Sequence, residues 1–120
     1  MKRLELVISM NALLENARAV RGRVPENVKI CAVVKADAYG HGAAELSRAL
    51  ESERLADAFA VATPEEGRAL REAGVKGEIL VLGLTDADGA EESVALALAQ
   101  AVDDASSLAM LERAAARQGR

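Results

Sequence analysis

The sequence predicts an α/β fold built from parallel βα units. Short, strand-like apolar runs alternate with amphipathic helical stretches along all 120 residues. No proline-rich or serine-rich linker divides the chain, so we expect one domain over residues 1–120. Strands that alternate with helices at intervals of about twenty to thirty residues indicate a parallel sheet. Four such units cannot close a barrel, which needs eight. Periodicity alone therefore leaves two architectures, a small open sheet or about half of a TIM-type (β/α)8 barrel.

The first helix is expected directly after Ser9, because apolar residues from Met10 onward recur at helical spacing until Gly22. Residues 28–34 form a near-continuous apolar run rich in β-branched side chains, which is typical of a strand buried on both faces. A second helix is expected over residues 42–53, and a second buried strand over residues 58–62.

The next helix has the clearest start signal in the chain. Thr63 is a favourable N-cap, Pro64 occupies the first helical position, and Glu66 lies three residues after the cap. This pattern predicts a capping box, in which the Thr63 and Glu66 side chains each bond to the other's backbone N–H. Gly74 is expected to end the helix.

The last two units carry weaker signals. Residues 78–82 predict a third strand, followed by a helix capped by Asp88 with Glu91 three residues later. Residues 99–102 predict a weak fourth strand. Asp104 is expected to cap a final helix that ends near Gly119.

Composition narrows the class of protein. Apolar residues make up 51% of the chain, enough for a core, and the net charge of −4 gives no basic patch for nucleic acid. The apolar runs are too short to span a membrane, and residues 1–11 do not resemble a secretory signal. The single cysteine, Cys31, cannot form an internal disulfide, so we expect a reducing, cytoplasmic location.

The stretch 32–42, AVVKADAYGHG, is the most informative in the chain. Lys35 ends the first apolar strand, and strand alternation places it on the same face as Cys31 and Val33. Partial desolvation at such a position favours the free amine, which Schiff-base chemistry with an aldehyde cofactor requires. From position alone, however, a lysine that simply extends into water is the more common case. Tyr39, His41 and the two glycines also have ordinary structural roles when each is taken alone.

Taken together, these residues resemble the pyridoxal-phosphate lysine signature of alanine racemases. The resemblance extends to LELVISMNALLEN at residues 4–16, FAVATPEEGRALREAG at residues 59–74 and EILVLG at residues 78–83, and it weakens after about Thr85. It implies about half of a TIM-type (β/α)8 barrel, with residues 1–120 as the N-terminal portion of a PLP-binding barrel domain and the C-terminal β-domain absent from this stretch.

The resemblance also implies a reaction and site residues. The reaction is the interconversion of L- and D-alanine for peptidoglycan precursors, with pyridoxal 5′-phosphate (PLP) as cofactor. Lys35 would bind PLP covalently and serve as one of two catalytic bases, and Tyr39 would hydrogen-bond the cofactor phosphate. Asp37 and His41 would only shape the loop. The second base would be a tyrosine from the partner subunit of a homodimer, so residues 1–120 alone are expected to have little or no activity.

Two alternatives remain at this stage. One is a PLP-binding barrel protein of the cofactor-homeostasis type, without racemase activity. The other is a small α/β binding module in which Lys35 is unmodified. The YGHG sequence at residues 39–42 and the lead-in at residues 4–9 favour the racemase over the first alternative.

Overall fold

The computed structural model describes residue 1 and residues 3–120. Over this part of the chain, helices and strands alternate as expected from the sequence. The elements, in order, are α1 (Met10–Arg21), β1 (Cys31–Val33), α2 (Lys35–Tyr39), α3 (Ala43–Ser52), β2 (Ala58–Val61), α4 (Pro64–Glu72), β3 (Glu78–Val81), α5 (Ala87–Ala95), β4 (Ala99–Gln100) and α6 (Ala105–Gln118).

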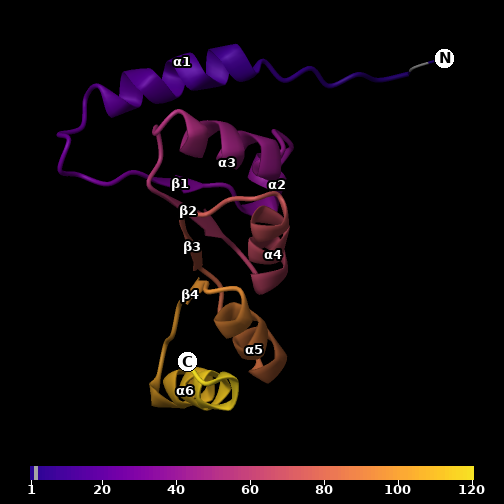
Figure 1. Ribbon diagram of the computed structural model, residues 1–120. Helices are drawn as coiled ribbons and strands as arrows, with labels where there is room; N and C mark the ends of the chain where they lie inside the picture. The colour runs from indigo at the N-terminus through magenta and orange to yellow at the C-terminus, as the bar shows by residue number, and fades with distance from the viewer. Residues whose placement is uncertain (2) are drawn as a thin grey trace.

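The four strands form one parallel sheet in the order β1-β2-β3-β4. Phe59 of β2 is in register with Ala32 of β1 and with Ile79 of β3. Helices α3, α4 and α5 lie on the same side of this sheet, while α1 and α6 lie at its two ends (Figure 1). The prediction of an α/β fold made of parallel βα units is therefore confirmed.

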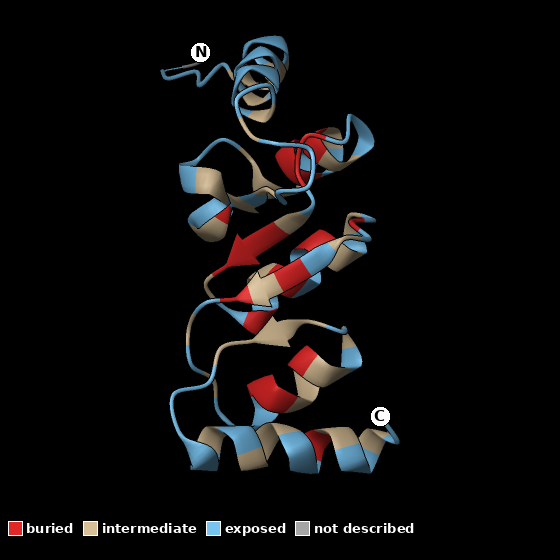
Figure 2. Ribbon diagram, turned by 90° about the vertical axis from the view of Figure 1, so that its left-hand side faces the viewer, coloured by how far each residue is buried: buried red, intermediate tan, exposed pale blue. Residues whose placement is uncertain are grey.

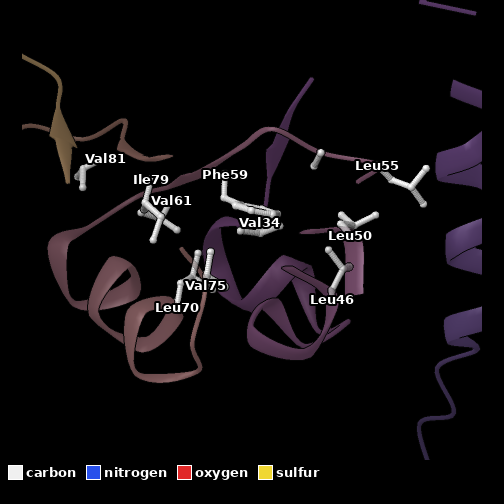
Figure 3. Close-up of a cluster of buried hydrophobic side chains, with 11 residues drawn as sticks. Val34, Leu46, Leu50, Leu55, Phe59, Val61, Leu70, Val75, Ile79 and Val81 are labelled. Carbon is white, nitrogen blue, oxygen red and sulfur yellow. The ribbon is translucent and has the colours of Figure 1, made fainter. Parts of the chain in front are cut away.

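The core lies between the sheet and this helix layer. Phe59, the only phenylalanine of the chain, is completely buried at its centre, as are Ile79 and Val81 of the neighbouring strand. Aliphatic side chains from α3 and α4 pack against them (Figure 3). Because β2 and β3 are the central strands, the buried segments concentrate there and in the facing sides of the helices (Figure 2).

The opposite face of the sheet carries no helix in the described chain. Val33 of β1 is 58% exposed on this face, and Cys31 is also exposed. The expectation that residues 28–34 form a strand buried on both faces is therefore wrong: the strand is Cys31–Val33, and only its helix-facing side is covered. With helices on one face of the sheet only, the molecule is extended. Its radius of gyration is 16.2 Å, against about 14 Å for a compact domain of this length.

The N-caps of α1 and α6 are the residues that the sequence predicts. Ser9 accepts a hydrogen bond from the Ala12 N–H at 3.3 Å and begins α1, as expected. Asp104 begins α6 and accepts from the Ser107 N–H at 2.7 Å, while the Ser107 hydroxyl accepts from the Asp104 N–H. The hydrogen bond from the Ser107 backbone N–H, the largest cause, lowers the pKa of the Asp104 carboxyl.

The cap of α5 differs from the prediction. Asp86, not Asp88, is the N-cap, because Asp86 has an extended backbone and its Oδ1 accepts from the Gly89 N–H at 2.9 Å. Glu91, expected to complete a box with Asp88, instead accepts hydrogen bonds from Gln118 and Arg117 of α6. Those two side chains, Gln118 first, lower the pKa of Glu91 and join the last two helices.

Arg71 of α4 satisfies backbone carbonyls where two helices end. Its guanidinium donates to the carbonyl oxygens of Val75 and Gly77, which connect α4 to β3. It also donates to those of Leu96 and Ala97, which follow α5, each at 3.0 Å. One side chain therefore supplies hydrogen-bond donors to four carbonyl groups in the connections that follow α4 and α5. None of the described helices is long and apolar enough to cross a membrane.

Replacing Arg71 with leucine should lower the free energy of unfolding by about 2–4 kcal/mol, since partly buried carbonyls would lose a charged donor. Urea denaturation followed by circular dichroism measures this loss. Arg68→Leu is the matched control, because Arg68 lies on the same helix but is exposed and, among the described residues, bonds only to the Glu92 side chain. Equal losses for the two variants would contradict the role assigned to Arg71.

Candidate functional site at the carboxyl end of β1

Lys35 lies where β1 ends at the carboxyl edge of the sheet. Parallel pairing continues one residue past the strand, because the Val34 N–H donates to the Ala60 carbonyl at 2.8 Å. Val34 itself is buried in the core, whereas Lys35 is partly exposed. Parallel α/β folds place their binding and catalytic groups at this edge of the sheet.

The chain after Lys35 does not form a right-handed helix. The four residues 36–39 all have φ values between 52° and 54°, so α2 is a left-handed turn. Residues with a Cβ adopt this geometry at a cost of about 1–2 kcal/mol each. A run of four persists only where surrounding contacts determine the backbone, and such strain is characteristic of functional sites.

Hydrogen bonds hold the turn at its far end. Asp37 Oδ1 accepts from the Ala43 N–H at 2.8 Å, which ties the turn to the start of α3. His41 Nδ1 lies 2.8 Å from the Ala38 carbonyl oxygen. Gly40 and Gly42 have φ values of 91° and 87°, which only glycine adopts readily. Asp37 and His41 thus have loop-forming contacts, in keeping with the structural part expected of them.

Glu66 of α4 holds the near end of the turn. Its Oε1 accepts from the Ala36 N–H at 2.8 Å, and its Oε2 accepts from the Ala62 N–H at 2.7 Å. The predicted capping box is therefore only half correct. Thr63 does accept from the Glu66 N–H, but the Glu66 carboxylate bonds to residues beyond the ends of β1 and β2 instead of to Thr63. The N–H groups of Ala36 and Ala62 are the donors that this carboxylate satisfies.

Tyr39 ends the left-handed turn and extends into solvent. Its side chain is 73% exposed, and its hydroxyl makes no hydrogen bond with the described residues. The turn places Lys35 and Tyr39 at its two ends, so an amine and a phenol hydroxyl are both available at the same edge of the sheet. We take these two groups as the candidate site.

A cleft of about 390 Å³ lies behind the turn, on the helix side of the sheet. Val34, Ala36 and Asp37 contribute to its wall, together with residues of α3 and α4, but Lys35 does not line it. The Lys35 side chain is thus not enclosed by the helix layer. This agrees with the strand alternation that placed Lys35 with Val33, away from the core.

Cys31 is the other candidate nucleophile on this strand. Partial burial raises the pKa of its thiol, and the Glu78 carboxylate on the sheet raises it further. Both effects favour the protonated thiol, which is a poorer nucleophile than the thiolate. Within the described chain, no three His, Cys, Asp or Glu side chains cluster as metal ligands would.

Comparison with known proteins identifies the family. Residues 8–120 match the model of the alanine racemase N-terminal domain. The chain is 40% identical over 113 residues to alanine racemase 1 of Caldanaerobacter subterraneus subsp. tengcongensis, covering 94% of this chain and 29% of that protein. It is 46% identical over 89 residues to alanine racemase 2 of Bacillus subtilis, covering 73% of this chain and 22% of that protein.

Solved structures agree with these relatives. The structure titled alanine racemase of Clostridium difficile 630 in complex with cycloserine superposes with a TM-score of 0.90 at 35% identity, covering 94% of this chain and 30% of that one. The racemase of Streptomyces lavendulae gives 0.84 at 35% identity, with 94% and 29% covered. The chain thus spans less than a third of the proteins it matches, and its four strands correspond to about half of a (β/α)8 barrel. The chain belongs to the alanine racemase family, and residues 8–120 match the N-terminal domain of that family.

Proposed function

We propose that this protein acts in the interconversion of L- and D-alanine, with PLP held on Lys35. The observation that carries this proposal is the position of Lys35. It stands at the carboxyl end of β1, immediately before a strained turn, in a chain of the alanine racemase family. Backbone strain at that point has no evident benefit for stability, which supports a functional reason for it.

The residues present fit the cofactor. An aldehyde needs an accessible amine, and Lys35 is partly exposed and forms no ion pair among the described residues. A phosphate group needs hydrogen-bond donors, and Tyr39 is exposed, with a hydroxyl that makes no hydrogen bond with the described residues. When bound, PLP supplies the electron sink that makes the α-hydrogen of an amino acid acidic.

Lys35 then has two tasks. Its Nζ would hold the cofactor, and its free amine would take or return the α-proton on one face of the amino acid. Racemisation needs a second base on the opposite face. Tyr39 is the only tyrosine of this chain, and we assign it to the cofactor phosphate. As the family resemblance implies, we propose that the second base is a tyrosine of a partner subunit in a homodimer.

Replacing Lys35 with alanine should abolish covalent attachment of PLP. Purified protein is mixed with PLP and reduced with borohydride, and the labelled peptides are identified by mass spectrometry. We expect the label on Lys35 in the parent and none in the variant. Lys76→Ala and Lys29→Ala are matched controls that should keep the label. A label spread equally over these lysines would contradict the assignment.

Tyr39→Phe should weaken PLP affinity by about tenfold, the effect of losing one hydrogen bond to a charged group. Fluorescence titration measures the dissociation constant. The same titration with pyridoxal, which lacks the phosphate, shows whether the lost affinity comes from the hydrogen bond between Tyr39 and the phosphate. If the substitution weakens both ligands equally, Tyr39 does not act through the phosphate.

The 120-residue chain by itself should interconvert L- and D-alanine poorly even when loaded with PLP, because its only tyrosine is already assigned to the phosphate. Chiral chromatography of alanine incubated with the loaded chain measures the conversion. Rapid racemisation by this chain would show that the second base lies within residues 1–120.

A further inference from the structure

Glu66 connects the ends of two strands through a single carboxylate. It is the third residue of α4 and is partly buried. One oxygen accepts from the N–H of Ala36, just after β1, and the other from the N–H of Ala62, just after β2. Both donors are backbone groups, so the carboxylate constrains the course of the main chain at the sheet edge.

The first of these bonds acts directly on Lys35. Two peptide units flank Lys35, and a third joins Val33 to Val34 just before them; each is planar, so one hydrogen bond orients a whole unit. The Val34 N–H donates to Ala60, and the Val34 carbonyl accepts from the Ala38 N–H at 2.9 Å. Both of these bonds are between backbone groups. The unit between Lys35 and Ala36 is held by Glu66 at 2.8 Å.

We propose that Glu66 is a positioning residue for Lys35. It fixes the peptide that follows the lysine and anchors the first residue of the left-handed turn, and it thereby sets the direction in which the amine leaves the backbone. This inference rests on the proposed attachment of PLP to Lys35. It gives Glu66 a role in cofactor binding although its own carboxylate bonds only to backbone.

Glutamine tests this role without changing the size of the side chain. Both partners of Glu66 are N–H donors, and a carboxylate offers an acceptor to each. Glutamine offers one carbonyl oxygen and one NH2 group, so one of the two donors would face another donor. Glu66→Gln therefore breaks one of the two bonds, while Glu66→Asp keeps the charge but is too short to reach both donors.

Two controls are available in the same chain. Glu51 of α3 is bonded in the same manner, since its carboxylate accepts from the backbone N–H of Gly77 at 2.5 Å and of Lys76 at 3.1 Å. Those residues precede β3, so this contact lies at the opposite edge of the sheet from Lys35. Glu65 is the exposed neighbour of Glu66 and controls for loss of one negative charge.

The experiment compares Glu66→Gln, Glu66→Asp, Glu51→Gln and Glu65→Gln in purified protein. The dissociation constant of PLP and the share of borohydride-fixed label on Lys35 are measured for each, with the thermal midpoint recorded beside them. We expect both Glu66 variants to bind PLP at least about tenfold more weakly and to spread label onto Lys29 and Lys76. Glu51→Gln should lose stability without either effect, and Glu65→Gln should lose neither. Equal PLP affinity in the Glu66 and Glu51 variants would overturn the proposal.

Amide hydrogen exchange, followed by NMR in the absence of PLP, separates this inference from the proposed function. The Ala36 and Ala62 amides should both be protected in the parent, and the one that loses its acceptor should exchange faster in Glu66→Gln. If the parent shows that protection but no label on Lys35, the proposed cofactor attachment fails and the inference falls with it. If the parent is labelled on Lys35 and these amides are equally unprotected in both proteins, the inference alone is wrong.

Discussion

The left-handed turn at residues 36–39 is the constraint on which the arrangement around Lys35 depends. Four consecutive residues with a Cβ hold a left-handed backbone geometry that costs each of them about 1–2 kcal/mol. The geometry persists because separate contacts meet on it: Glu66 at its start, and Asp37 and His41 at its end. These contacts determine the path of the chain between the end of β1 and the start of α3. They also determine the place of Lys35, the residue immediately before the turn.

The one-sided helix layer gives this turn its surroundings. Helices α3, α4 and α5 cover one face of the sheet and supply Glu66 from that side (Figure 1). Side chains of the other face, such as Val33, are exposed in the described chain. Lys35 therefore lies at a sheet edge that has the helix layer on one side and an uncovered face of the sheet on the other. In the racemases that this chain resembles, the same segment is less than a third of the protein.

Local signals in the sequence predicted most elements. Ser9, Thr63 and Asp104 begin helices as expected, because N-capping depends on residues only three positions apart. The prediction of Asp88 as the N-cap of α5 was wrong because Asp86, two residues earlier, also has a capping side chain. Only the backbone geometry shows which of the two begins the helix. The prediction that residues 28–34 are buried on both faces was wrong, because a strand's apolar pattern does not reveal whether a second layer covers it.

The site was only partly predictable. The place of Lys35 at a strand end follows from the apolar run before it, whereas its chemistry came from the resemblance of the motif. Nothing in Ala36, Asp37, Ala38 and Tyr39 favours left-handed geometry as a run, so tertiary contacts override local preference there. From the sequence, Glu66 was predicted only as a capping residue. Its bond to Ala36 could not be predicted from local signals because it joins residues 30 positions apart in sequence.

The central claim is that Lys35 carries the cofactor from a backbone fixed in this turn, and a crystal structure of the protein grown with PLP tests it most directly. We expect electron density continuous from Lys35 Nζ to the cofactor, with residues 36–39 left-handed and the phosphate beside Tyr39. Cofactor density joined to another lysine, or a right-handed backbone at residues 36–39 beneath a bound cofactor, would contradict it.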